Sequence, residues 1–364
     1  MPSSTSNFDF QRVIPAHPWR GMAVLVALSV IIATIAWEVY VRSIGYAPTL
    51  NDTADLWAEA RRRVTPGSLV IVGDSRPHFD LDLDELERGL GTRPVQLSQP
   101  GSCAFPVFKD VIDDESFHGT IICSIVPLMW FAPGGPLVEN AERAVKRQQT
   151  QTWAQWASHL LAVPLEERIA FLKMDELDTR GLLKRINLPN RANAQVGPAL
   201  PPFFASIDRE RRARMMDACA QPGPLQERVK NGWLPLFTPP PPPSWVPAEA
   251  FRARVGEAIE NRFRDTAALV EKLRKRGGKV VFVRFPVTGP LKEHEDRLTP
   301  RQGPWERVLR DSGAPGIHFE DHAELASFEC PEWSHLSAPD SVEFTRRLVP
   351  HLRTALQLNT VATN

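Results

Sequence analysis

The chain lacks an excess of charge of either sign, because 43 lysines and arginines are balanced by 43 aspartates and glutamates. Nucleic-acid binding by a whole chain depends on a basic surface, so this composition gives no support to that class of function. Cysteine is also scarce, and its spacing matches no metal-binding motif. We therefore expect neither a metal nor an organic cofactor. The sequence leaves open whether the four cysteines form disulfides: Cys103, Cys123, Cys219 and Cys330.

Proline, in contrast, is abundant, with 34 residues in the chain. Many prolines fall between residues 187 and 246, which predicts an irregular stretch that ends in the run Pro239–Pro243. Such a run can only be extended or polyproline II. We interpret it as a stiff surface connection, with a protein-docking segment as the alternative.

One segment near the N-terminus has no charged residue over the seventeen positions Gly21–Trp37. That length is at the short end of a bilayer span. Trp19 and Tyr40 are placed to lie at the two membrane interfaces, and Arg20 precedes the segment. We interpret the segment as a single-span anchor, with a cleaved signal peptide and a buried helix as the alternatives.

This interpretation predicts a cytoplasmic N-terminus and a large part of the chain outside the cytoplasmic membrane, in the periplasm. The predicted parts are a tail at 1–20, an anchor at 21–41, a polar stalk at 42–66 and one domain at 67–364. We expect a large insertion in that domain at about 128–246, with helix over 138–180.

Strand-like and helix-like segments alternate before and after this insertion. The first group comprises strand Leu69–Val72, helix Asp82–Leu90, strand Pro94–Leu97, helix Phe105–Asp113 and strand Thr120–Val126. The second comprises helix Ala248–Arg276, strand Lys279–Val283, strand Gly316–Phe319 and a final helix that opens at Ser337 and runs to Leu356. Alternation of this kind predicts an α/β fold, a mostly parallel sheet between two helical layers.

The run Gly73-Asp74-Ser75-Arg76 follows the first strand directly, so Ser75 is expected at the carboxyl edge of the sheet. Far downstream, Glu332 and His335 lie three residues apart on a loop before the final helix. A serine hydroxyl needs a base, and the base needs a group that orients it. We predict that Ser75 is a nucleophile, His335 its base and Glu332 the orienting acid, which favours acyl transfer or ester hydrolysis.

Other residues compete for these roles. Asp340 is the alternative acid, although it fits a helix-capping role after Ser337. His78 is the alternative base, three residues after Ser75. Asp74 is expected to order the turn rather than to take part in chemistry.

An oxyanion hole needs donors aimed at the developing negative charge. We expect the backbone N–H groups of Ser75 and Gly101 to supply them. Arg76 is a candidate for binding an anionic or sugar group, with a surface salt bridge as the alternative, and Arg284 is a second candidate at the end of a later strand.

The Gly73-Asp74-Ser75 turn, Gly101 and the Glu332-x-x-His335 loop together resemble the SGNH (GDSL-type) hydrolase superfamily. The resemblance covers about 68–126 and 279–357. It implies a serine nucleophile at Ser75 and a base at His335, with glutamate where the family usually has aspartate. The family's third block is Gly-x-Asn-Asp, whereas residues 124–127 here offer no Asn, so one oxyanion donor is missing.

A single span followed by such a domain is similar to membrane-bound proteins that handle acyl groups on cell-envelope polymers, among them the alginate acetylation proteins and the D-alanine transfer protein of teichoic acid synthesis. This similarity implies an acyltransferase or esterase acting on acyl, above all acetyl, esters of an envelope glycan, alone or beside a membrane-bound O-acyltransferase. Two alternatives stay open: a catalytically silent polysaccharide-binding protein, and a structural envelope protein that docks partners through the insertion.

Overall fold

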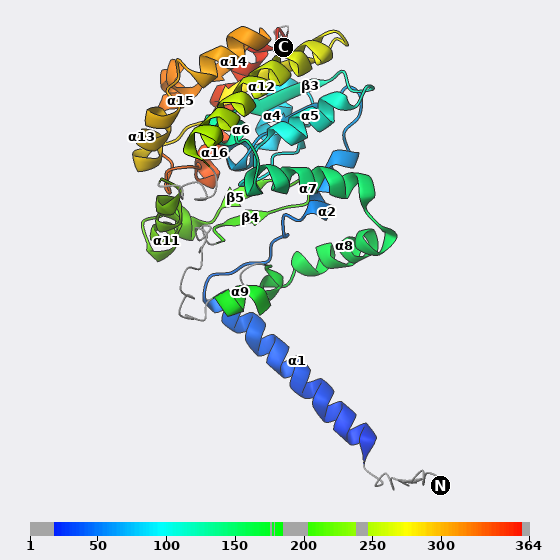
Figure 1. The fold of residues 1–364 in the computed structure, drawn as a ribbon. Helices are drawn as coiled ribbons and strands as arrows, with labels where there is room; N and C mark the ends of the chain where they lie inside the picture. The colour runs from blue at the N-terminus through cyan, green and yellow to red at the C-terminus, as the bar shows by residue number, and fades with distance from the viewer. Residues whose placement is uncertain (1–17, 175–176, 178, 185–202, 238–246, 359–364) are drawn as a thin grey trace, which may run out of the picture. The chain divides into compact units, whose positions relative to one another are not determined.

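The computed structural model describes residues 18–174, 177, 179–184, 203–237 and 247–358 (Figure 1). The chain divides into two compact units, Met1–Tyr46 and Ala47–Asn364. The first unit contains the helix α1 (Trp19–Ser43), and the second contains the sheet and every other helix described.

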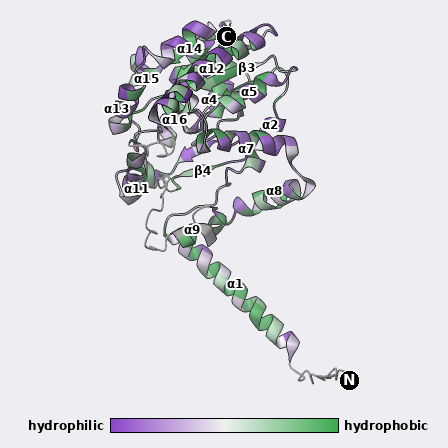
Figure 2. Cartoon of the chain, in the orientation of Figure 1, coloured by the Kyte–Doolittle hydropathy of each residue, from purple (hydrophilic) through white to green (hydrophobic). Residues whose placement is uncertain are grey.

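Helix α1 is long and apolar enough to cross a membrane. Its 25 residues correspond to about 37 Å, which exceeds the roughly 30 Å of a hydrocarbon core. Figure 2 shows hydrophobic colour along most of its length, and its apolar window has no buried residue. A helix of this kind near an N-terminus is either an anchor or a signal sequence.

The second unit is built on a five-stranded sheet in which every pairing is parallel. The strand order is β2-β1-β3-β6-β7. The bounds are Val95–Gln96 for β2, Leu69–Val72 for β1, Thr120–Ser124 for β3, Lys279–Arg284 for β6 and Gly316–His318 for β7. The pairing of β3 with β6 confirms that the sheet is begun before the predicted insertion and completed after it.

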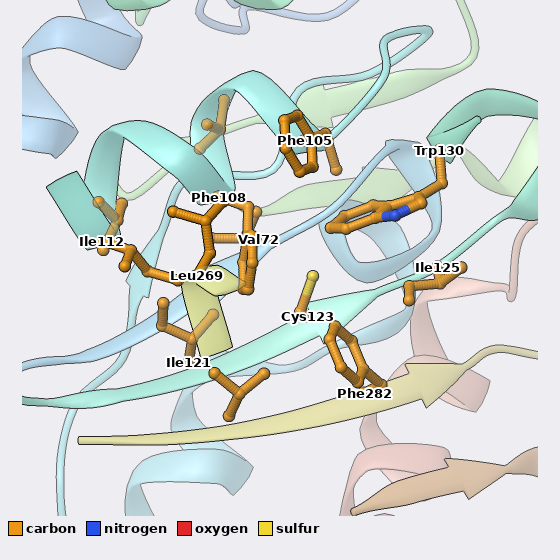
Figure 3. Packing of buried hydrophobic residues seen from close by; sticks show 14 of the residues in the cluster. Val72, Phe105, Phe108, Ile112, Ile121, Cys123, Ile125, Trp130, Leu269 and Phe282 are labelled. Carbon is orange, nitrogen blue, oxygen red and sulfur yellow. The ribbon is translucent and has the colours of Figure 1, made fainter. Parts of the chain in front are cut away.

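Alternate strand residues enter two separate cores, so both faces of the sheet are covered. Val72 and Cys123 belong to one core, which Figure 3 shows, whereas Ile71 and Ile122 belong to the other. The first core is closed by α2 (Ala54–Arg62), α5 (Phe105–Asp113), α7 (Pro136–Thr150), α12 (Ala248–Arg274) and α14 (Pro304–Ser312). The second is closed by α4 (Leu83–Leu90), α15 (Ala323–Ala326) and α16 (Ala338–Ala355).

Local signals set several of these boundaries. Asp82 caps α4 by accepting hydrogen bonds from two backbone N–H groups, and Gly91 ends the helix at φ +77°. Ser337 caps α16 and accepts the N–H of Asp340. Both helices therefore begin and end within a residue or two of the predicted positions.

The stretch 42–66, predicted as a stalk, contains α2. Leu56 and Trp57 of this helix are buried, and α2 packs against α7. The Trp57 indole N–H donates to the carbonyl of Leu97 at 3.0 Å. This part of the chain thus contributes to the core of the second unit.

The predicted insertion contains more regular structure than its proline content indicates. Over 203–237, where we expected an irregular chain, the hairpin of β4 (Ala205–Ile207) and β5 (Ala213–Met215) packs with α11 (Pro224–Trp233) in a small third core around Phe79. The other elements are α6 (Pro127–Trp130), α8 (Trp153–Glu166), η1 (Ala170–Leu172), α9 (Thr179–Lys184), α10 (Asp217–Ala220) and η2 (Leu234–Phe237). The run Pro239–Pro243 lies outside the described residues.

Candidate active site

Ser75 stands where β1 ends and the short helix α3 (Ser75–Asp80) begins. The turn between them requires glycine at position 73, because a Cβ there would lie 2.3 Å from the ring of Pro77 and 2.8 Å from the Cβ of Ser124. This close approach brings the end of β1 against the end of β3. Ser75 is half-buried, so part of the residue is exposed to solvent.

Asp74 orders this turn, as the sequence predicted. Its Oδ1 accepts the backbone N–H of Arg76 at 2.8 Å, and its Oδ2 accepts the hydroxyl of Ser124 at 3.2 Å. Ser124 opens the block in which the resemblance called for an Asn. Here its hydroxyl donates to Asp74, the residue that precedes Ser75.

The structure brings Ser75, His335 and Glu332 together in one chain of hydrogen bonds. His335 Nε2 lies 2.7 Å from Ser75 Oγ, and His335 Nδ1 lies 2.9 Å from Glu332 Oε1. Because a carboxylate can only accept, the Nδ1 proton points to Glu332 and leaves Nε2 to accept the serine hydroxyl. This arrangement is that of a nucleophile, a base and an orienting acid.

Glu332 is fully buried and is held by further neutral donors. Its Oε1 also accepts the backbone N–H of His335 at 2.6 Å, and its Oε2 accepts the indole N–H of Trp233 at 2.6 Å. Trp233 belongs to α11, inside the predicted insertion. The insertion therefore contributes directly to the triad.

Aromatic rings enclose His335. Phe79 stacks on the imidazole with ring centroids 4.4 Å apart, and Phe204 and Trp233 lie at 5.8 and 6.0 Å. These rings exclude water from the base, which strengthens its electrostatic interactions. Sequence reasoning missed all three rings, since no spacing connects Phe204 or Trp233 to a loop about a hundred residues away.

Asp80 fixes the backbone just after His335. Its Oδ1 accepts the N–H of Leu336 at 2.8 Å, and its backbone carbonyl accepts the hydroxyl of Thr345 in α16 at 3.2 Å. Burial raises the pKa of Asp80 well above its usual range. Asp80 therefore ties α3, the His335 loop and α16 together, a role that the sequence did not indicate.

Arg76 and Arg284, predicted to bind substrate, meet on a different group. Both guanidiniums are buried and bind Glu295 of α13 (Gly289–Leu298), and Arg284 also donates to the carbonyl of Ile125 at 3.1 Å. Burial alone would raise the pKa of Glu295, but the two positive charges outweigh it and lower that pKa to about 2. Arg76 thus forms a salt bridge, but a buried one rather than the surface pair of the alternative. The cluster links Arg76, which follows Ser75, to the ends of β3 and β6.

The competing residues are placed elsewhere. His78 is fully buried, its Nε2 lies 3.9 Å from Asp52, and neither ring nitrogen has a hydrogen-bond partner among the described residues. Burial lowers the pKa of His78 to about 4, against the attraction of Asp52. Asp340 accepts a hydrogen bond from the hydroxyl of Ser337 at the start of α16.

Gly101 is exposed and has a φ angle of +62°. Its role as an oxyanion donor stays a prediction.

The described residues offer one group with metal-ligand geometry, away from the triad. The ligand atoms of His322, Glu324 and His351 lie within 4.8 Å of one another, a proximity across α15 and α16 that sequence spacing did not show.

The four cysteines are buried and unpaired. Two surface hollows, of about 420 and 590 Å³, contain no triad residue: one is lined by residues that include Arg63, Arg93 and Glu210, the other by residues of α12 and Glu115.

Comparison with known proteins yields no relative: no family model, no curated protein and no solved structure matches the chain.

Proposed function

We propose that the chain is a membrane-anchored, extracytoplasmic serine acyltransferase or esterase of the SGNH-like type, acting on acyl esters of a cell-envelope glycan. The observation that carries the proposal is the continuous hydrogen-bonded chain from Ser75 through His335 to Glu332. A purely structural role would not require an imidazole that contacts a serine hydroxyl through one ring nitrogen and a carboxylate through the other.

The proposed reaction has two halves. Ser75 Oγ attacks the acyl carbon while its proton passes to His335 Nε2, and Glu332 stabilises the imidazolium. The imidazolium then protonates the leaving alcohol oxygen, and the acyl group remains on Ser75. In the second half, water or a sugar hydroxyl gives its proton to His335 and attacks the ester carbon, after which the proton returns to Ser75 Oγ.

The oxyanion requires donors besides the triad. The backbone N–H groups of Ser75 and Gly101 are the proposed pair. The absent Asn of the third block predicts a slower reaction, since loss of one donor costs about 10²–10³ in rate.

The fold and the N-terminal helix support the rest of the proposal. A parallel sheet covered by helices on both faces, with the serine at the carboxyl end of β1, fits a three-layer SGNH-like domain. Retention of α1 as an anchor would hold this domain at the outer face of the cytoplasmic membrane, where envelope glycans are modified. A membrane-bound acyltransferase would be a suitable acyl donor in the same bilayer.

The test is covalent labelling of the full chain, reconstituted in nanodiscs, with a fluorophosphonate probe. We expect the wild type to label and Ser75→Ala and His335→Ala not to label. Ser116→Ala, at an exposed serine, is the control and should label like the wild type. A folded wild type that does not label, or a Ser75→Ala variant that does, would contradict the proposal.

The second candidate is a silent glycan-binding protein, and the missing third-block Asn is the observation that favours it. It predicts no labelling of the wild type and glycan binding that Ser75→Ala leaves unchanged. The enzyme proposal predicts labelling together with release or transfer of acetyl groups from acetylated glycans.

A further inference from the structure

Helix α8 presents apolar side chains to solvent rather than to the protein. Trp153 is 84% exposed and Leu161 is 70% exposed, and Trp156, Leu160 and Leu165 are also exposed. From Trp153 to Leu165 the helix contains no lysine, arginine, aspartate or glutamate. An uncharged helix normally buries its apolar face, so this one lacks its partner among the described residues.

The spacing places these side chains on one wide stripe, which covers about half of the helix circumference. Trp153, Trp156, Leu160, Leu161 and Leu165 follow one another at intervals of three or four residues, apart from the adjacent pair Leu160–Leu161. The two indoles form an edge-to-face pair with centroids 5.7 Å apart. The result is a continuous apolar surface about 20 Å long, as expected for a helix of fourteen residues.

The opposite side of α8 is fixed to the protein. His159 is buried and its Nε2 lies 2.8 Å from Glu59 of α2, and Glu166 accepts the backbone N–H of Asn51 at 2.9 Å. The helix therefore cannot turn its stripe inward without breaking these contacts.

Asn51 also connects the C-terminal end of α8 to the chain that leaves α1. Its side chain donates to the carbonyl of Leu172 at 3.1 Å and accepts the N–H of Met174 at 2.8 Å. Asn51 follows Ser43, the last residue of α1, by only eight positions. Eight residues span at most about 29 Å, so the chain between α1 and the residue that contacts α8 is short.

We propose that the apolar face of α8 lies in the lipid interface of the membrane that α1 spans. The inference rests on the proposed retention of α1 as an anchor. The molecule that would cover the apolar face of α8 is phospholipid. Tryptophan and leucine on one face are typical of helices that lie in the plane of a bilayer. In α8 the opposite face, with the buried His159, is packed on the protein. Tryptophans favour the headgroup level, where Trp153 and Trp156 would lie. The exposed Met174, beside Asn51, would extend the same contact.

The experiment places an environment-sensitive fluorophore on single cysteines of the full chain in nanodiscs of phosphatidylethanolamine and phosphatidylglycerol. Leu161→Cys reports on α8, Val26→Cys on α1, and Arg310→Cys on an exposed position of α14. The four natural cysteines are buried, which keeps the labelling selective. We expect strong quenching by doxyl-labelled lipid at residues 26 and 161 and none at residue 310.

Each other outcome overturns the inference in a distinguishable way. Quenching at residue 26 without quenching at residue 161 leaves the anchor standing and removes α8 from the membrane. A residue 161 fluorophore that brightens without lipid quenching indicates a protein partner instead. Absence of quenching at residue 26 removes the anchor, and the α8 inference with it.

Discussion

Two buried glutamates of the second unit differ in the groups that bind their carboxylates. Glu295 is bound by two guanidinium groups, those of Arg76 and Arg284. Glu332, equally removed from solvent, is bound by the imidazole of His335, an indole N–H and a backbone N–H. Glu295 binds Arg76, the residue that follows Ser75, whereas Glu332 binds His335, whose other ring nitrogen contacts Ser75.

The difference separates support from chemistry. A carboxylate flanked by two fixed cations has its charge fully compensated, and removing it would leave those cations buried without a partner. A carboxylate held only by neutral donors keeps its negative charge available to the imidazolium that forms when Ser75 gives up its proton. The comparison therefore assigns stability to Glu295 and activity to Glu332.

Glu332→Gln should have the largest effect on activity. An amide has one oxygen, so it cannot accept hydrogen bonds at both positions where the carboxylate of Glu332 accepts them. We therefore expect the rate of labelling by the fluorophosphonate to fall by about 10³–10⁴. The melting temperature should also fall, because the amide –NH2 leaves at least one of the buried N–H donors of Trp233 and His335 without an acceptor, which costs about 1–3 kcal/mol. Glu329→Gln, at an exposed neighbour, is the control and should leave both measurements unchanged.

Glu295→Gln should have the largest effect on stability. Two buried guanidiniums would lose their charge partner, which costs about 3–5 kcal/mol in the free energy of unfolding. Chemical denaturation measures this loss. Asp296→Asn removes a neighbouring carboxylate from a solvent-exposed pair with Lys292 and should cost about 1 kcal/mol or less. Equal losses for the two variants would show that the cluster is not a support.

His78→Gln tests the alternative base through the pH dependence of stability. With its pKa lowered to about 4, folded His78 stays neutral between pH 6.5 and 4, whereas the unfolded chain takes up a proton there. The free energy of unfolding of the wild type therefore falls with acidification, by about 3 kcal/mol from this group. His78→Gln should remove that component and label normally at neutral pH.

The control for this variant is His118→Gln, at an exposed histidine. It should label like the wild type at neutral pH. Loss of labelling in His78→Gln at neutral pH, in a protein that still folds, would return His78 to the list of candidate bases.

Trp233→Phe should have the smallest effect of the four. It removes the indole N–H from Glu332 but keeps an aromatic ring beside His335, so we expect the labelling rate to fall about tenfold, the usual value of one hydrogen bond to a charged group. Trp156→Phe, in the exposed stripe of α8, should leave labelling unchanged. Equal rates for the two variants would show that the insertion does not position the acid.

Several local signals in the sequence were informative, although the proline content of 203–237 was not. Strand periodicity, the glycine turn at 73 and the three-residue spacing of Glu332 and His335 were enough to predict the sheet and the triad geometry. The contacts made by Arg76 and Arg284 were not predictable, because their partner Glu295 is brought near by folding alone. The same holds for Trp233 and Phe204, which reach His335 only through the path of the insertion.

The pairing of β3 with β6 also has a consequence for how the chain folds. Thr120 lies opposite Lys279, so the edge of β3 has no partner until well over a hundred further residues have been made. At about 5–20 residues per second, that interval is roughly ten to thirty seconds of synthesis. Parallel pairing over so long a separation folds slowly, and the waiting edge is prone to wrong association. The unpaired edge of β3 is therefore expected to need protection by a chaperone during synthesis, even though the finished sheet is covered on both faces.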